Sequence, residues 1–222
     1  MCLSKPEMVL LDLDGTLVDS VPDLAYCIDR MLEHLGLPPR GTEKVRQWMG
    51  NGLQRLVKRA LVDGFEGKPD NALFDRAFAI LLELYGENTC ERSTLYPGAR
   101  EGLTYLQQSA YQLGCVTNKL AQFTQPMLQT LGIYDDFAII ICGDTLPKKK
   151  PDPMPLLHAA QYFGVEPEKA LMVGDTVNDI QAARAAGFQI LCVTYGYNQG
   201  GNIDGAGPDA TVDSLAELPS LI

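Results

Sequence analysis

The residues best suited to chemistry stand in the run DLDGT at residues 12–16, directly after the apolar stretch 8–11. A buried strand in this position would deliver the carboxylates of Asp12 and Asp14, two residues apart, into a glycine-containing loop. Burying a carboxylate costs free energy unless a hydrogen-bond donor or a cation compensates its charge, and two close carboxylates repel each other. A bound cation would relieve both effects. A solvated strand-to-turn junction also accounts for the run taken alone, because Asp and Gly are ordinary turn residues.

Two later motifs carry groups that can bind an anion. Thr117 and Asn118, in VTNK, follow an apolar run and precede a helical pattern, and the free N–H groups of a helix start bind phosphate well. An N-cap Thr or Asn is the alternative explanation. Lys150 ends the run KKK and is restricted by the proline that follows it, whereas Lys148 and Lys149 are expected to be solvated.

A fourth motif, GDTVND at residues 174–179, again places two acids, Asp175 and Asp179, after an apolar run. An acidic helix N-terminus, favoured by the helix dipole, is the alternative. The four motifs together supply acids for a metal, a hydroxyl, backbone donors and a lysine. These groups suit phosphoryl transfer, where catalysis rests mainly on positioning and charge stabilisation.

The elements that must position these motifs are five short apolar runs that read as buried strands. Four of them follow residue 110 and alternate with helical patterns, which favours a parallel sheet covered by helices on both faces. Ligands bind at the carboxyl edge of such sheets, where all four motifs are expected. The predicted strands span residues 8–13, 113–117, 137–142, 170–174 and 189–193.

About a hundred residues separate the first two predicted strands, far more than one crossover helix needs. Apolar stripes predict helices from about residue 20 to 35, over 42–49, from 53 to 61 and over 70–85. Residues 18–93 are therefore expected to form a helical insertion over the end of the first strand. Trp48 and Tyr85 in this insertion are expected to serve packing.

Composition sets limits on the function class. The 222 residues have a net charge of −10. This argues against sequence-independent binding of nucleic acid, which requires a basic surface. The six cysteines form no CxxC pair, so no disulfide framework or zinc site is indicated, and a reducing cytoplasm fits best. No apolar run is long enough for a signal peptide or a membrane span.

The motifs DLDGTLVDS, VTNK, KKPDP and GDTVND, in this order, resemble those of the haloacid dehalogenase superfamily of phosphotransferases. The resemblance covers essentially the full length. It implies an α/β fold with a Rossmann-like parallel-sheet core, residues 1–17 and 94–222, and a helical cap, residues 18–93, inserted between strands 1 and 2. The cap would set substrate specificity.

The resemblance also implies roles for single residues. Asp12 would be the nucleophile that forms an aspartyl-phosphate, and Asp14 would protonate the leaving alcohol and then activate water. The carboxylate at position 14 points to phosphatases or phosphomutases, because the dehalogenase branch lacks it. Thr117 and Lys150, with Asn118 beside them, would bind the phosphoryl group.

The implied cofactor is Mg²⁺, held by Asp12, the carbonyl of Asp14 and Asp175, an oxygen-rich set that suits a hard cation. Asp179 would support the metal waters or orient Lys150. The expected partner is a small phosphorylated metabolite, with no nucleic acid and no membrane. The chain is expected to be a monomer or a homodimer.

Within the superfamily the chain is similar to bacterial phosphoglycolate phosphatases, in its cap stretch at residues 48–61 and in residues 174–198. A carboxylated substrate needs a second anion site, which Asn51, Gly52 and Arg55 could provide from the cap. A plain helix–helix turn is the alternative there. The alternatives in function are a phosphatase or phosphomutase for a sugar phosphate, and a non-catalytic phosphate-binding module.

Overall fold

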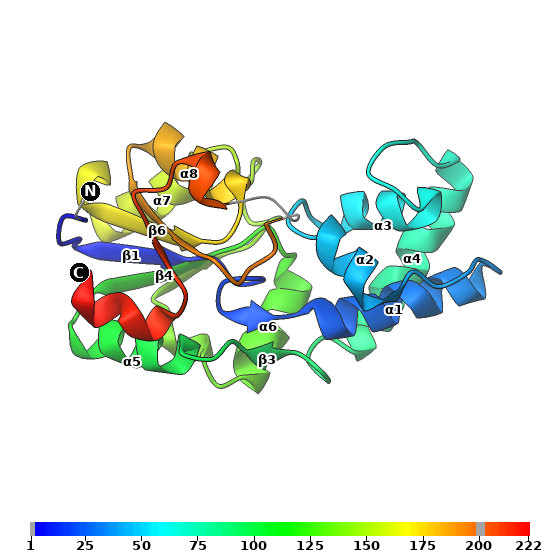
Figure 1. The fold of residues 1–222 in the computed structure, drawn as a ribbon, viewed down its shortest axis with the longest axis horizontal. Helices are drawn as coiled ribbons and strands as arrows, with labels where there is room; N and C mark the ends of the chain where they lie inside the picture. Colours follow the sequence, from blue (N-terminus) through cyan, green and yellow to red (C-terminus); the bar gives the residue numbers. More distant parts are fainter. Residues whose placement is uncertain (1–2, 199–202) are drawn as a thin grey trace.

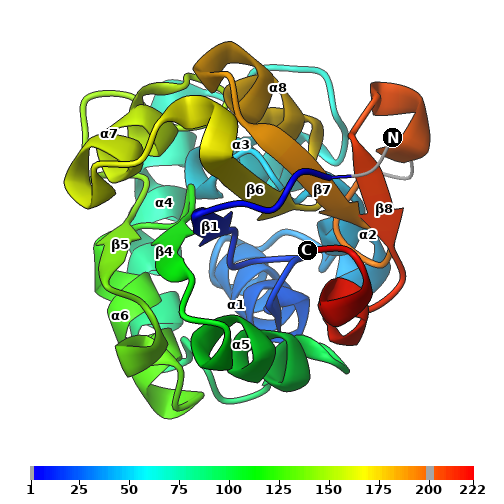
Figure 2. The ribbon, with the colours of Figure 1, turned by 90° about the vertical axis from the view of Figure 1, so that its left-hand side faces the viewer.

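A parallel sheet of six strands, in the order β5-β4-β1-β6-β7-β8, forms the base of the molecule. The computed structural model describes residues 3–198 and 203–222. The central strand β1 is fully buried, as expected for a strand with neighbours on both sides and helices on both faces. Figure 2 shows the strands side by side in this order. Their bounds are β1 (Met8–Leu11), β4 (Gln112–Val116), β5 (Ile139–Ile141), β6 (Ala170–Gly174), β7 (Gln189–Val193) and β8 (Ala210–Val212).

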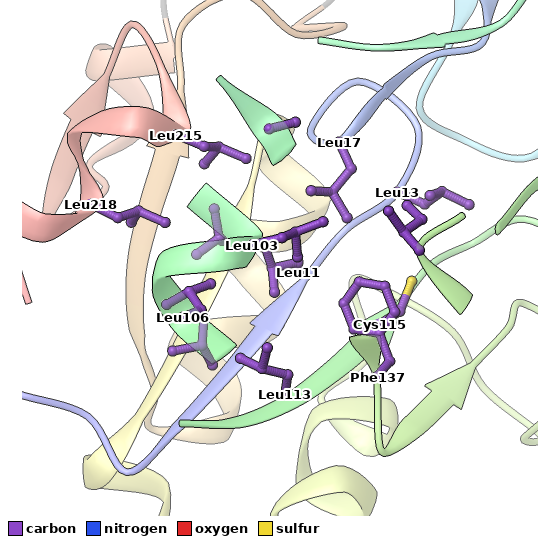
Figure 3. Close-up of a cluster of buried hydrophobic side chains, with 14 of the residues drawn as sticks. Leu11, Leu13, Leu17, Leu103, Leu106, Leu113, Cys115, Phe137, Leu215 and Leu218 are labelled. Carbon is purple, nitrogen blue, oxygen red and sulfur yellow. The ribbon is translucent and has the colours of Figure 1, made fainter. Parts of the chain in front are cut away.

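Alternate side chains of the strands feed two separate apolar clusters, because successive residues of a strand point to opposite faces. Val9 and Leu11 of β1 face one cluster, whereas Met8 and Leu10 face the other. Figure 3 shows the first cluster, in which Leu11 meets Leu103. The first face is covered by α5 (Ala99–Gln108), α6 (Ala121–Thr130) and a 3-10 helix (Leu215–Ser220), and the second by α7 (Met154–Phe163) and α8 (Val177–Ala186).

Four consecutive helices between β1 and β4 form a separate group that stands beside the sheet in Figure 1. They share a third apolar cluster, which also takes in Phe123 of α6 and Tyr197. The rings of Tyr85 and Phe123 lie 4.7 Å apart, so the group packs on the core. The helices are α1 (Val21–His34), α2 (Gly41–Trp48), α3 (Leu53–Val62) and α4 (Asn71–Glu87).

The two segments that connect the sheet to this helical group run side by side. They pair as a short antiparallel ribbon of β2 (Val18–Asp19) and β3 (Thr94–Leu95). Next to it, the buried carboxylate of Asp23 accepts hydrogen bonds from the backbone N–H groups of Arg92 and Ser93. The two segments are thus tied together by both backbone and side-chain contacts.

The predicted α/β fold is confirmed, with all five predicted strands in one parallel sheet and the four predicted helices present. Sequence patterns missed the ribbon of β2 and β3, whose strands are two residues long and too short to show a period. They also missed β8, a three-residue edge strand. Among the described residues no helix is long and apolar enough to cross a membrane.

Candidate active site

Asp12 follows β1 directly and is 8% exposed. Its N–H donates to the carbonyl of Val173, which continues the sheet pairing by one residue. Its Oδ1 accepts from the N–H of Leu13 at 2.7 Å and lies 2.9 Å from Nζ of Lys150. Burial raises the pKa of Asp12 to about 7, and Lys150 opposes that rise. The carboxylate is therefore held at the sheet edge in a poorly solvated position.

Lys150 contacts groups at or beyond the carboxyl ends of three strands, β1, β4 and β6. Its Nζ donates to the carbonyl of Val116 at 2.7 Å, and it lies 2.7 Å from Oδ1 of Asp179 as well as against Asp12. Lys150 is 3% exposed, and the two carboxylates raise its pKa against the opposing effect of burial. The ammonium group is thus positively charged and fixed beside Asp12, and the sequence expectation that Asp179 could orient Lys150 agrees with this geometry.

Asp175 is fully buried at the end of β6 and is held from two sides. Its Oδ1 accepts from the hydroxyl of Thr16 at 2.9 Å, and its Oδ2 accepts from the N–H of Tyr197 at 2.6 Å. A Cβ at Gly15, which has φ +93°, would lie 2.2 Å from Oδ2 of Asp175. Glycine at position 15 is therefore needed for the close approach of the DLDGT loop to this acid.

Thr117 and Asn118 follow β4, at the same edge of the sheet. Thr117 is 3% exposed, and its N–H donates to the carbonyl of Ile141. The side-chain N–H of Asn118 donates to the carbonyl of Lys150 at 2.9 Å. Asn118 therefore supports the backbone of the lysine, while both residues also line the cavity over Asp12.

That cavity has a volume of about 50 Å³ and lies between the sheet edge and the helical group. The sheet edge contributes all of its charged lining groups, and the helical group contributes apolar side chains and two glycines. The lining residues of the core are Asp12, Asp14, Thr117, Asn118, Lys119, Lys150 and Thr176; those of the helical group are Leu24, Trp48, Met49, Gly50, Gly52, Leu53 and Leu56.

A family model described as haloacid dehalogenase-like hydrolase matches residues 9–193, which span the sheet edge and the helical insertion. The chain belongs to this family. It is 60% identical to the phosphoglycolate phosphatase of Nitrosococcus oceani, an alignment that covers 99% of this chain and 98% of the relative. It is 46% identical to that of Thiobacillus denitrificans, with 96% of this chain and 94% of the relative covered.

Solved structures agree with the curated relatives. The crystal structure of a predicted phosphoglycolate phosphatase from Haemophilus somnus superimposes with a TM-score of 0.92 at 37% identity, and 98% of each chain is covered. The resemblance stated from the four motifs is confirmed. This haloacid dehalogenase-like hydrolase is a phosphoric monoester hydrolase.

The sheet edge of the hydrolase fits a divalent metal ion. Oxygen atoms of Asp12, Asp175 and Asp179 lie within 4.8 Å of one another. Burial, Asp12 and Asp179 together raise the pKa of Asp175 well above its ordinary value. Three buried carboxylates beside a single ammonium group leave excess negative charge, which a hard cation with oxygen ligands would neutralise. Asp12 and Asp175 were predicted as ligands; Asp179, predicted as a supporting residue, joins this group.

Sequence reasoning missed Lys119, the last residue of VTNK. Its Nζ lies 3.1 Å from Oδ1 of Asp14 and also donates to the hydroxyl of Tyr85 from α4. Lys119 is 6% exposed, and Asp14 and Tyr85 raise its pKa against burial. The position of Lys119 in the same motif as Thr117 was a signal that could have identified it. The sequence does not show that its partner is Tyr85 of the helical group.

Tyr197 is a second residue that sequence reasoning did not single out for the site. Its N–H holds Asp175, while its hydroxyl accepts from the N–H of Ser20 at 2.8 Å and donates to Asp19 at 2.7 Å. The predicted packing role of Tyr85 is confirmed by its full burial, although its hydroxyl also contacts Lys119.

The residues expected to bind a substrate carboxylate from the helical group divide into two sets. Gly52 lines the cavity over Asp12, but Asn51 and Arg55 do not; they line a different cavity of the same group. The geometry therefore corrects the placement of Asn51 and Arg55. Arg55 is one residue away from Leu56, and a step of one residue turns a helix by about 100°, so the two side chains face different sides of α3.

Proposed function

We propose that the protein hydrolyses 2-phosphoglycolate to glycolate and phosphate through an aspartyl-phosphate on Asp12. The observation that carries this proposal is the pairing of Asp12 with Lys150 at 2.9 Å, with Asp14 two residues away and paired with Lys119 at 3.1 Å. One carboxylate is fixed beside a positive charge that can receive phosphoryl oxygens. The other stands over the same cavity and can handle protons.

The first step forms a bond between an Oδ atom of Asp12 and phosphorus and breaks the bond between phosphorus and the glycolate oxygen. Asp14, in its protonated form, transfers its proton to that oxygen. Lys150 and the hydroxyl of Thr117 bind the phosphoryl oxygens, on which negative charge is spread in the transition state. Asp179 keeps Lys150 in position, and Asn118 holds the backbone of Lys150.

The second step uses Asp14 as a base. Asp14 removes a proton from a water molecule, the water oxygen bonds to phosphorus, and the bond between phosphorus and Asp12 breaks. Inorganic phosphate leaves and Asp12 returns to its carboxylate form. Lys119, whose Nζ lies 3.1 Å from Oδ1 of Asp14, holds this carboxylate over the cavity in both steps.

The cofactor in this proposal is Mg²⁺, held by Asp12, Asp175 and the carbonyl of Asp14. It would neutralise charge on the carboxylates and on the phosphoryl oxygens. Thr16 and the N–H of Tyr197 fix both oxygens of Asp175, and therefore set the direction in which this ligand can point.

We also propose that residues 18–93 act as a specificity cap on a catalytic core of residues 1–17 and 94–222. The cap closes the cavity with apolar side chains, which suits a substrate with few polar groups beyond its two anionic ends. Lys119 lines the cavity with its Nζ 3.1 Å from Oδ1 of Asp14, and this cation supports the choice of a substrate with a carboxylate. The five cysteines among the described residues are free, which supports a reducing cytoplasm as the site of action.

A panel of phosphate monoesters tests the substrate. It contains 2-phosphoglycolate, sugar phosphates and p-nitrophenyl phosphate, each with Mg²⁺ and with a chelator. We expect kcat/KM for 2-phosphoglycolate to exceed the other values by about a hundredfold. A preference for a sugar phosphate would overturn the substrate but keep the phosphatase, and a phosphorylated product from a sugar phosphate would indicate a mutase. If no ester is hydrolysed, the hypothesis that remains is a non-catalytic phosphate-binding module.

A further inference from the structure

The cap contains a second cavity, of about 620 Å³, on the side of α3 that faces away from Asp12. It lies between α3 and the loop that joins α3 to α4. Four cationic residues line it, Arg55, Lys58, Arg59 and Lys68, against one acid, Glu66. The lining of this cavity carries three more positive than negative groups, although the chain as a whole has a net charge of −10.

Arg59 is the buried member of this group, with 8% of its surface exposed. Two of its nitrogens donate hydrogen bonds, Nη1 to the carbonyl of Trp48 at 2.6 Å and Nη2 to Oδ1 of Asn51 at 3.1 Å. Its Nε is buried and has no hydrogen-bond partner among the described residues. A buried guanidinium donor without an acceptor is costly, and an anion in the cavity would supply one.

The charge of Arg59 is also left without a carboxylate. Among the described residues neither it nor Arg55, Lys58 or Lys68 forms an ion pair. Burial and the neighbouring Arg55 lower the pKa of Arg59, and Glu66 opposes this change. Glu66 is the one acid that offsets the four cations of the lining.

We propose that this cavity binds a small multivalent oxyanion, of the phosphorylated or polycarboxylate class, at a site separate from the catalytic cavity. The lysines supply charge, and Arg59 supplies a fixed donor. Phe65 lies over the guanidinium of Arg59 at 5.0 Å and would shield a bound anion from water on that side. The proposal concerns a second ligand and does not depend on which monoester the enzyme hydrolyses.

An anion bound at this site would change the positions of residues that line the cavity over Asp12, and Arg59 would transmit the change. Trp48, whose carbonyl accepts from Arg59, is a lining residue of the cavity over Asp12, as are Met49, Gly50 and Gly52. An anion that accepts from Nε binds the same guanidinium group whose Nη1 donates to the Trp48 carbonyl, so a shift of that group also moves the acceptor. The loop that carries the cap's share of the catalytic cavity is therefore coupled to the second site.

The test measures binding of pyrophosphate and of citrate to the full chain by calorimetry, in buffer freed of metal with a chelating resin and containing no soluble chelator. The variant Lys58→Gln with Lys68→Gln removes two of the cavity's cations. The matched control Arg30→Gln with Arg76→Gln removes two exposed cap cations outside the cavity, and changes the net charge equally. We expect the first variant to weaken binding of at least one probe about tenfold and the control to leave it unchanged.

Equal loss in both variants, or absence of binding of both probes to the wild-type chain at millimolar concentration, would overturn the proposal. The comparison of pyrophosphate with citrate separates a phosphate-specific site from a general polyanion site. Trp48 is the only tryptophan in the chain and lines the cavity over Asp12, so a change in its fluorescence reports coupling when the amide shifts place the probe at the second cavity.

Backbone amide shifts on the wild-type chain give a result that is independent of how the variants fold. Shifts that begin in α3 and residues 63–68 would support the proposal. Shifts confined to the residues around Asp12 would place the probe in the catalytic cavity and overturn it. Because no substrate or metal is present, failure here leaves the proposed hydrolysis untouched, and failure of the monoester panel leaves this result intact.

Discussion

The catalytic core and the cap contribute to one cavity in opposite ways. The core supplies Asp12, Thr117 and Lys150 from the ends of different strands, and these side chains are buried. The cap supplies apolar side chains and the glycines at positions 50 and 52. The cations of α3 are turned away, toward the second cavity. The difference teaches that the charged lining groups of this cavity come from the sheet edge, whereas the cap lines it with apolar side chains and glycines.

The contrast is sharpest at Lys119, which belongs to the core but contacts the cap. It joins Asp14 to the hydroxyl of Tyr85 in α4. This contact connects the cap, through a core side chain, to Asp14, the residue proposed to transfer protons. Variants on the two sides of the cavity should therefore differ in which kinetic constant they change.

The largest effect is expected for Asp12→Asn. The substitution removes the nucleophile while keeping the size of the side chain, and kcat for 2-phosphoglycolate should fall by about four orders of magnitude. Steady-state kinetics with the phosphate release assay measures it. Retention of more than a tenth of the activity would contradict the assignment of Asp12, provided that the protein preparation is free of other phosphatases.

Removal of the divalent metal should cost roughly a thousandfold in kcat/KM, because three carboxylates then repel the phosphoryl group. Activity is measured after dialysis against a chelator and again after Mg²⁺ is restored. Recovery with Mg²⁺ is the expected control. Full activity in the chelated protein would show that the acids of the sheet edge work without a cation.

Lys119→Gln should lower kcat by about tenfold to a hundredfold, because Asp14 loses the ion pair that holds its carboxylate over the cavity. Steady-state phosphate release with 2-phosphoglycolate measures kcat. Lys148→Gln is the matched control, since Lys148 is exposed and pairs only with Asp152 among the described residues. Equal rates in the two variants would rule out a role for Lys119.

A smaller effect is expected on the cap side of the cavity. Trp48→Phe keeps an aromatic side chain but makes it smaller, so less apolar surface lines the cavity. KM for 2-phosphoglycolate should rise about threefold, with kcat nearly unchanged. Phe78→Leu, a cap substitution that does not line the cavity, serves as the control. A fall in kcat with constant KM for Trp48→Phe would show that the cap takes part in the chemistry. That result would contradict the division of roles between core and cap.

The sequence predicted the core more completely than the cap. Each strand-end motif could be placed because apolar runs of four to six residues mark buried strands, and the carboxyl ends of parallel strands meet at one edge. Asp12, Asp175, Lys150 and Asp179 therefore came together as expected. The motif did not reveal that Lys119 reaches across to Tyr85, because that contact depends on how α4 packs on α6.

In the cap, the sequence predicted four helices but not their rotation. The stripe of Leu53, Leu56, Val57 and Ala60 identifies the buried face of α3, and it leaves open which cavity each polar residue of the helix would line. Arg55 was therefore expected over Asp12 and lies instead at the second cavity. Side-chain direction around a helix follows from tertiary packing, which a single sequence does not specify.

The most direct test of the account is to trap the acyl-phosphate on Asp12. The protein is mixed with 2-phosphoglycolate and Mg²⁺, quenched during turnover and reduced with borohydride, which converts an aspartyl-phosphate to homoserine. Peptide mass spectrometry then locates the modified residue. We predict homoserine at position 12, and none when substrate is omitted or when Asp12 is replaced by Asn. An unmodified Asp12 during steady turnover, or homoserine at another acid, would contradict the account.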